Sequence, residues 1–310
     1  MTIAMSLSCP SCQSTSLEDE GPLPLFNQGM FGGQPSSLAI EPGHFMRCRV
    51  CDLCFRSPAP SDEVLTSLYE ELPDTIWEST EVRPYWPLTL QWLEANACNS
   101  KVLDVGCFAG DLLHWLPSKW EKFGVEPAKA ASELAAKRGI KMLGKTTSDL
   151  GGHRGTFGAV VSFDVIEHIT QPLPFVTAMR DSLAPGGCLI LLTGATDSMP
   201  YRSFGRHYWY GSFPEHVSFF SLAWFKWVAD QLGMTIVTHQ YLTCEKRIWP
   251  LWCKQMAQTV IQTSIRLLRE RGVSEAWLKS LPFIGRATQW TTVPWWRQAT
   301  DHIMVVLKKS

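Results

Sequence analysis

The sequence predicts an α/β fold in which a parallel sheet is covered by helices on both faces. From residue 101 onward, short apolar runs alternate with helical segments, and turn residues follow each run. This alternation is typical of strand–helix–strand units, which build parallel sheets. The chain has 310 residues, of which 45% are hydrophobic and 18% charged, an ordinary globular composition. Two cysteine pairs before residue 60 add a small metal-held module at the N-terminus.

Seven segments of the chain are rich in apolar and β-branched residues and have the length of strands. In chain order they are KVLDVG (101–106), KFGVEP (122–127), IKML (140–143), AVVSFD (159–164), CLILLTG (188–194), TIVTHQYL (235–242) and DHIMVVLKK (301–309). Two helices are expected earlier, in DEVLTSLYEEL after Ser61 and in PYWPLTLQWLEANA from Pro84.

These patterns divide the chain into five regions. They are a cysteine-rich zinc-binding module (1–60), a helical connector (61–98), the main α/β domain (99–243), a Trp-rich basic helical insertion (244–299) and the last strand of the sheet (300–310).

The first region carries two C-x-x-C pairs, CPSC and CRVC. Two pairs of this kind can hold one zinc ion tetrahedrally through four thiolates, and such a closed site is structural. The predicted ligands are Cys9, Cys12, Cys48 and Cys51. Cys54 and His44 are alternative ligands at this stage. Without a secretory signal, paired cysteines favour metal binding over disulfides.

A ligand-binding turn is predicted in VLDVGCFAGDLL, residues 102–113. A buried strand there runs into a turn with Gly106 and Gly110 and then into a helix, so that the backbone can approach a ligand closely. Glu126 ends the next strand, 22 residues after Asp104. An acidic residue at that place can accept hydrogen bonds from both hydroxyls of a ribose.

Over roughly residues 85–243 the chain resembles the class I S-adenosylmethionine-dependent methyltransferases. VLDVGCFAG, FGVEP, VVSFDVIEHI and LAPGGCLILLTG look like motifs of that family in the right order. The resemblance implies a Rossmann-like seven-stranded methyltransferase sheet and S-adenosyl-L-methionine as cofactor. The cofactor-binding residues that it implies are Asp104, Gly106, Cys107, Gly110, Glu126, Asp149 and Asp164. One departure is Phe108, where the family usually has glycine.

The cysteine-rich module joined to this fold resembles bacterial sugar methyltransferases. This implies an acceptor that is a small molecule or a glycan, methylated on an oxygen or a carbon of a sugar. A quinone or other small-molecule methyltransferase with a divalent metal is the second hypothesis. A scaffold protein that binds the cofactor without turnover is the third.

Two Glu-His pairs compete for the role of general base. Glu215–His216 resembles the EH-aromatic-Ser motif of sugar methyltransferases, which implies His216 as the base with Glu215 beside it. An imidazole near its ordinary pKa suits proton removal at neutral pH, and an adjacent carboxylate can orient it. Glu167–His168 is the alternative pair, with His168 as the base.

Two further alternatives concern the same chemistry. The spacing of Asp164, Glu167 and His168 matches the D-x-x-E-H pattern by which some quinone methyltransferases bind a divalent metal. Tyr208 belongs to an aromatic and basic segment expected near the methyl site, and it could serve in place of a histidine.

The formal net charge of −1 gives no support for a nucleic-acid partner. The N-terminus lacks a basic segment followed by an apolar run, and we find no apolar stretch near the roughly 20 residues of a membrane span. We therefore expect a cytoplasmic protein. The oligomeric state is not predicted.

The insertion carries six tryptophans and nine basic residues against Glu270 and Glu275 between residues 246 and 297. Tryptophans among cations suit an amphipathic element at an anionic membrane surface, here the inner face of the membrane. The alternative is a helical subdomain that packs its tryptophans against the sheet or a second subunit.

Overall fold

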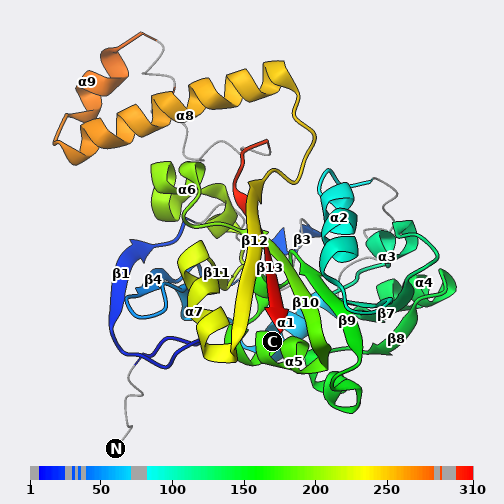
Figure 1. The fold of residues 1–310 in the computed structure, drawn as a ribbon. Coiled ribbons are helices and arrows are strands. Elements are labelled where there is room, and N and C mark those ends of the chain that lie inside the picture. The colour runs from blue at the N-terminus through cyan, green and yellow to red at the C-terminus, as the bar shows by residue number, and fades with distance from the viewer. Residues whose placement is uncertain are drawn as a thin grey trace, which may run out of the picture.

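A seven-stranded sheet forms the centre of the protein (Figure 1). The structure is a computed structural model that describes residues 7–24, 30–31, 34–35, 40–70, 82–282, 287 and 298–309. In chain order the strands of the sheet are β6 (Lys101–Val105), β7 (Glu121–Val125), β8 (Lys141–Gly144), β9 (Phe157–Phe163), β10 (Leu183–Gly194), β12 (Met234–Leu242) and β13 (His302–Lys309). All seven predicted strands are confirmed.

The spatial order of the strands is β12-β13-β10-β9-β6-β7-β8. Strands β6 to β10 pair in parallel, whereas β13 runs antiparallel between β10 and β12. The chain changes direction across the sheet between β6 and β9, and open α/β sheets bind ligands at such a switch point, beyond the carboxyl ends of the strands.

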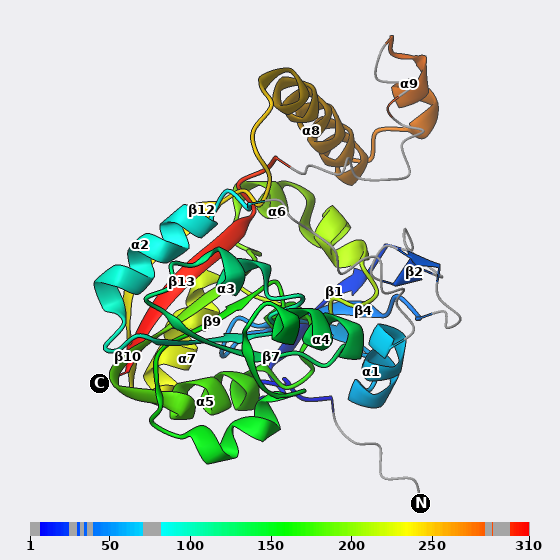
Figure 2. The ribbon, with the colours of Figure 1, turned by 90° about the vertical axis from the view of Figure 1, so that its right-hand side faces the viewer.

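Helices cover both faces of the sheet, as predicted (Figure 2). One face is covered by α5 (Pro172–Ser182) and α7 (Leu222–Leu232). The other is covered by α2 (Trp86–Asn96), α3 (Asp111–Trp115) and α4 (Lys129–Lys137). Along β13, Ile303 and Val305 belong to the first core and Met304 and Val306 to the second. Two apolar cores on one strand require an apolar residue at nearly every position.

A second, four-stranded sheet has the order β1-β4-β5-β11. Strands β1 (Leu17–Pro22), β4 (His44–Cys48) and β5 (Cys54–Ser57) come from the cysteine-rich region, but β11 (Ser218–Phe219) comes from the main domain. The module predicted as 1–60 therefore shares a sheet with the main domain. Cys9, Cys48 and Cys51 also belong to the same apolar core as α7.

The other elements are short. They are the pair β2 (Met30–Phe31) and β3 (Gln34–Pro35), the helices α1 (Asp62–Glu70) and α6 (Met199–Phe204), and 3-10 turns at Thr147–His153, Ile166–His168, Gly205–His207 and Trp209–Ser212. Helices α1 and α2 correspond to the two helices predicted in the connector.

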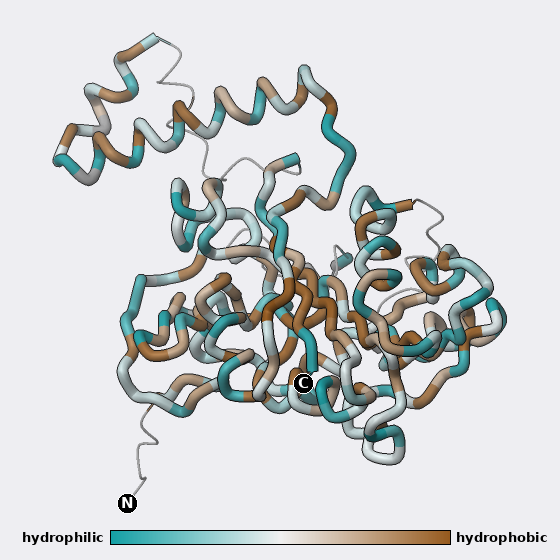
Figure 3. Tube along the Cα trace, viewed as in Figure 1, coloured by the Kyte–Doolittle hydropathy of each residue, from teal (hydrophilic) through white to brown (hydrophobic). Residues whose placement is uncertain are grey.

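The insertion forms α8 (Trp249–Glu270) and α9 (Glu275–Ser280), which stand away from the sheet (Figures 1 and 3). Trp249 and Trp277 are at least half exposed. Among the described residues, no helix is long and apolar enough to cross a membrane. Arg286, Trp290, Trp295, Trp296 and Arg297 lie outside the described residues. Contact of this region with a membrane surface stays a prediction.

Candidate functional site

A cavity of about 1080 Å³ lies at the carboxyl ends of the parallel strands. It is lined by residues that follow β6, β7 and β9, by the segment 209–216 and by α1. Nine of the candidate residues named from the sequence line this one cavity: Asp104, Gly106, Cys107, Glu126, Asp164, Glu167, His168, Glu215 and His216. The structure thus brings the predicted cofactor residues and both candidate bases together.

The turn after β6 has the left-handed backbone that the glycine pattern predicts. At Gly106 φ is 78°, and a Cβ there would lie 2.4 Å from Cγ2 of Val165. Phe108 also has a positive φ, of 55°. Phenylalanine in that conformation is strained, and the backbone N–H of Phe108 donates a 2.9 Å hydrogen bond to Oε2 of Glu126, which fixes the turn. Phe108 therefore adopts the left-handed backbone that glycine takes without strain, at the position where the family usually has glycine.

Two buried carboxyl groups face the cavity. Oε1 of Glu126 accepts a 2.9 Å hydrogen bond from the N–H of Ala128. Burial raises the pKa of Glu126, and the N–H donors of Ala128 and Phe108 oppose that shift. Burial, with repulsion from Glu126, raises the pKa of Asp104 to about 8. Carboxyl groups in such surroundings favour a cationic or hydroxyl-bearing ligand.

Gly110 and Asp149 differ from the prediction, because neither is among the residues that line the cavity. At Gly110 φ is 76° and a Cβ would lie 2.0 Å from Cδ1 of Ile140, so this glycine allows close packing. Oδ2 of Asp149 accepts hydrogen bonds from the N–H groups of Lys145 and Thr146, at 2.8 and 3.0 Å. These bonds order the loop, whose residues 145–148 line the cavity.

His216 is buried, and its Nδ1 lies 2.7 Å from the carbonyl oxygen of Tyr210. A carbonyl can only accept, so Nδ1 carries the proton and Nε2 has the free lone pair. Burial, together with the neighbouring His168, lowers the pKa of His216 well below its ordinary value. The imidazole is therefore neutral at neutral pH, with Nε2 as its acceptor atom, but the lowered pKa makes it a weaker base than the imidazole near its ordinary pKa that we expected.

The orienting group of His216 differs from the prediction. We expected the carboxylate of Glu215, but the carbonyl of Tyr210 holds Nδ1. Glu215 is buried and lines the cavity, and its carbonyl oxygen lies 3.1 Å from Nδ1 of His168. The rings of His168 and His216 are in edge-to-face contact, 5.0 Å apart between centroids.

Glu167 holds Tyr210, the residue that orients His216, through a hydrogen bond. Its side chain is 1% exposed and accepts hydrogen bonds from the hydroxyls of Tyr210, at 2.6 Å, and Thr193, at 2.8 Å. The ring of Tyr210 lies 4.1 Å from that of His216 between centroids. Tyr210 thus links Glu167 to His216 through its hydroxyl, its ring and its carbonyl group.

The D-x-x-E-H residues do not form one group of metal ligands. Among the described residues, Asp164 groups with Cys244 and His302, whereas Glu167 and His168 group with His216. Asp164 has a φ of 53° just after β9, and its Oδ1 lies 3.8 Å from Nε2 of His302. The turn after β9 thus separates Asp164 from the other two residues.

Tyr208 is also placed differently from the prediction. It is 2% exposed, donates its hydroxyl proton to Asp301 and is not part of the cavity lining. His302, which the sequence analysis missed, does line the cavity. It begins β13, and the start of an antiparallel strand lies at the edge where the parallel strands end. The antiparallel direction of the last strand is the signal that could have identified His302 as a residue of the site.

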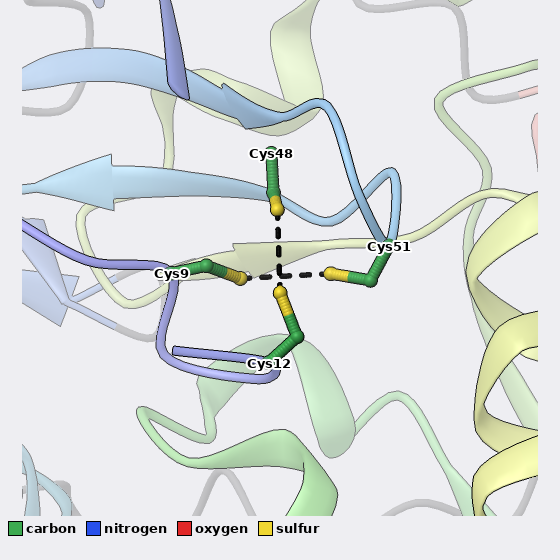
Figure 4. Close-up of side chains that lie close together, drawn as sticks. All are labelled: Cys9, Cys12, Cys48 and Cys51. Atoms are coloured by element: carbon green, nitrogen blue, oxygen red, sulfur yellow. Dashed lines mark hydrogen bonds between the residues drawn. The ribbon is translucent and has the colours of Figure 1, made fainter. Parts of the chain in front are cut away.

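The four predicted zinc ligands form one cluster at a separate site (Figure 4). The Sγ atoms of Cys9 and Cys51 are 3.5 Å apart, and those of Cys12 and Cys48 are 3.4 Å apart. Zinc–sulfur bonds of about 2.3 Å place tetrahedral sulfurs about 3.8 Å apart, so the cluster fits a zinc ion.

The two halves of this cluster repeat one backbone conformation. Gln13 and Asp52, each directly after a C-x-x-C pair, have φ of 61° and 62°. In each half the N–H two residues after the first cysteine donates to its sulfur, from Ser11 to Cys9 and from Val50 to Cys48, both at 3.4 Å. N–H groups aimed at a sulfur favour its thiolate form, which is the form that binds metals.

The alternative metal ligands lie outside this cluster. Cys54 is fully buried in another apolar core, beside Phe45 and Phe219. Nδ1 of His44 lies 2.8 Å from Oδ2 of Asp19 in an exposed pair. The choice of Cys48 and Cys51 over Cys54 and His44 therefore agrees with the structure.

A comparison with known families identifies the domain. The methyltransferase domain family matches residues 75–239, more than half of the chain. The chain belongs to the methyltransferase domain family. Its matched part contains the cavity-lining turns after β6, β7 and β9 and the segment with His216.

Curated relatives match this chain over part of their own length. The ubiquinone biosynthesis O-methyltransferase of Psychrobacter cryohalolentis is 28% identical over 134 residues, which cover 34% of this chain and 52% of the relative. The probable tRNA methyltransferase 9B of Mus musculus is 28% identical over 120 residues, covering 38% of this chain and 27% of the relative. The chain thus spans about half, or less, of these relatives.

Solved structures show the same fold. Phosphoethanolamine N-methyltransferase 2 of Haemonchus contortus, in complex with S-adenosyl-L-methionine, matches with a TM-score of 0.50 and 15% identity. The match covers 83% of this chain and 61% of that one. At this identity the likeness concerns the fold, which is the Rossmann-like methyltransferase fold that the sequence predicts.

Proposed function

We propose that the protein methylates a hydroxyl group of a ring-shaped small-molecule acceptor, with S-adenosyl-L-methionine as cofactor and His216 as general base. The observation that carries this proposal is the state of His216. Its Nδ1 is occupied by the carbonyl of Tyr210, so that Nε2 is the basic atom of a residue on the cavity wall. The same cavity holds the turn and the two carboxyl groups expected at a cofactor site.

The residues of the cavity fit the cofactor. Glu126 would hold the ribose hydroxyls, and Asp104 with the backbone at Gly106 would hold the cationic methionine part. When bound, the cofactor supplies an electrophilic methyl group on a sulfonium. His216 would accept the proton of the acceptor hydroxyl at Nε2 as that oxygen takes the methyl group from the sulfonium sulfur.

We propose a sugar as the acceptor, because the segment EHVSFFS (215–221) resembles the EH-aromatic-Ser motif of sugar methyltransferases, with Val217 in place of the aromatic residue. Trp209, Tyr210 and Phe213 line the cavity, and their faces suit the apolar side of a sugar ring. A phenolic or quinol acceptor is the second candidate. The similarity to a ubiquinone biosynthesis O-methyltransferase favours this second candidate. The other relative described above is named for a tRNA, and neither is named for a sugar.

The acceptor class is tested by incubating the protein with methyl-labelled cofactor and fractionated cell extract. Label in nucleotide sugars or glycan intermediates would support the sugar proposal, and label in the quinone fraction would support the second candidate. Label in tRNA would contradict both, together with the expectation that nucleic acid is not a partner. Cofactor binding without any labelled acceptor would favour a scaffold role.

We also propose that Cys9, Cys12, Cys48 and Cys51 hold one structural zinc ion. Four thiolates leave no open coordination position, so the ion would stabilise the fold without taking part in methyl transfer. Its support is the fit of the sulfur cluster described above.

The raised pKa of Asp104 predicts that cofactor affinity increases with pH. In the free protein this pKa is about 8, so the carboxyl group is largely protonated near pH 6. A cationic ligand favours the carboxylate, so affinity should rise between about pH 6 and pH 8, by at most about tenfold per pH unit. Calorimetric titration over this range measures the slope. Asp104→Asn should bind more weakly and with a flatter pH dependence, and an equally steep slope in both proteins would contradict the assignment.

A further inference from the structure

Arg56 lies in β5, next to the cysteine cluster in sequence, yet its side chain reaches the segment that carries His216. The side chain is 2% exposed. Its Nε donates to the carbonyl oxygen of His216 at 3.1 Å, and its Nη2 donates to those of Gly211, at 3.1 Å, and Phe213, at 2.9 Å. Its Nη1 donates to the carbonyl of Pro42. One guanidinium therefore binds three carbonyls of the segment 211–216 and ties them to the N-terminal region.

Only arginine can make this set of bonds. Its five N–H donors lie in one rigid plane, whereas a lysine ammonium is a point charge with three donors on a flexible chain. Burial lowers the pKa of Arg56 to about 10, so the side chain stays cationic at neutral pH. The charge strengthens each hydrogen bond, and buried carbonyls deprived of their donor are costly.

The main chain of Arg56 reinforces the same contact. Its N–H donates to the carbonyl of Val217 at 2.9 Å, and the next pairs are Phe55 with Ser218 and Cys54 with Phe219. The backbone on both sides of the His216 side chain is thus held by one strand of the cysteine-rich region. Tyr210, whose carbonyl orients Nδ1, lies one residue before Gly211 in the same segment.

We propose that Arg56 is a positioning residue that holds the segment 211–216 so that Nε2 of His216 meets the acceptor. This inference rests on the proposed role of His216 as general base. Arg56 acts through the carbonyls of the segment, and it is separate from the cofactor residues at Asp104 and Glu126. It also gives the cysteine-rich region a role in catalysis, since β5 brings the guanidinium to the site.

The test compares Arg56→Lys with Arg47→Lys. Arg47 is the matched control because it is a neighbouring arginine of the same sheet, in β4, and its bonds go to Glu20, at 2.6 Å, and Asp52, at 2.8 Å, both within the cysteine-rich region. For Arg56→Lys we expect kcat to fall by up to about 10²-fold, with unchanged cofactor affinity by calorimetry. Arg47→Lys should leave kcat unchanged.

Two further measurements separate positioning from a merely structural role. Amide hydrogen exchange should increase in a peptide covering residues 209–217 of Arg56→Lys but stay unchanged around Cys9 and Cys12. The double variant Arg56→Lys/His216→Ala should be no slower than His216→Ala alone, because Arg56 acts through His216.

The outcomes distinguish this inference from the proposed function. If His216→Ala is inactive while Arg56→Lys has normal kcat, the inference is overturned and the proposed function stands. If His216→Ala is fully active, the proposed function fails and the catalytic role of Arg56 fails with it. An additive loss in the double variant would also overturn the inference.

Discussion

Replacement of His216 by alanine is expected to lower kcat by about 10²–10⁴-fold while cofactor affinity stays near normal. The variant removes the only atom proposed to accept the acceptor proton, Nε2, whose lone pair is free because Nδ1 binds the carbonyl of Tyr210. His216 belongs to the segment before β11, whereas the proposed cofactor residues lie at the carboxyl ends of β6 and β7 or directly after them. Steady-state kinetics together with calorimetric titration of the cofactor measure the two quantities separately.

His168→Ala is the matched control, because His168 is a second cavity histidine in ring contact with His216. Nδ1 of His168 binds the carbonyl of Glu215, so His168→Ala loses a structural contact. The variant should therefore have a lower melting temperature while its turnover stays largely intact. Full activity in His216→Ala with an inactive, well-folded His168→Ala would reverse the assignment of the two histidines. Equal losses in both variants would indicate a site in which the pair acts as a unit.

Replacement of Cys9 by serine is expected to abolish zinc binding and to destabilise the whole protein. Structural zinc sites of four ligands contribute on the order of 10 kcal/mol or more of apparent binding free energy, and most of it is lost with one thiolate. Because β5 pairs with β11 and Cys9 lies in the same core as α7, the loss should lower the melting temperature of the main domain as well. Elemental analysis and thermal unfolding measure the two effects.

Cys54→Ser is the control for this experiment. Cys54 is as buried as Cys9 but lies outside the sulfur cluster, so its variant should retain one zinc per chain and lose only packing energy. Full zinc content in Cys9→Ser would refute the ligand set. Zinc loss in Cys54→Ser with an intact Cys9 cluster would show that the fifth cysteine is a ligand after all.

Several features of the protein follow from its sequence alone, because local patterns specify them. The seven strands were predictable since each is a short apolar run between turn residues, and buried parallel strands need such runs. The cysteine cluster was predictable because a C-x-x-C pair brings two sulfurs to one turn by itself, and two such turns complete a tetrahedron. The turn at Gly106 and the place of Glu126 were predictable because they directly follow strands.

Other features depend on contacts between residues distant in the sequence, and only the tertiary structure decided them. Arg56 and His216 are 160 positions apart, and nothing near either residue indicates the carbonyl contacts between them. The sequence suggested Glu215 as the orienting group of His216 because the two are adjacent, but the turn at 209–216 brings the carbonyl of Tyr210 to Nδ1 instead. Backbone carbonyls are present at every residue, so no side-chain pattern can single out the one that binds. The same reason explains why the sequence suggested a cysteine-rich module separate from the main domain. Its last strand, β5, pairs with the two residues of β11 through main-chain hydrogen bonds. Any sequence can form such bonds once the fold brings the two strands together.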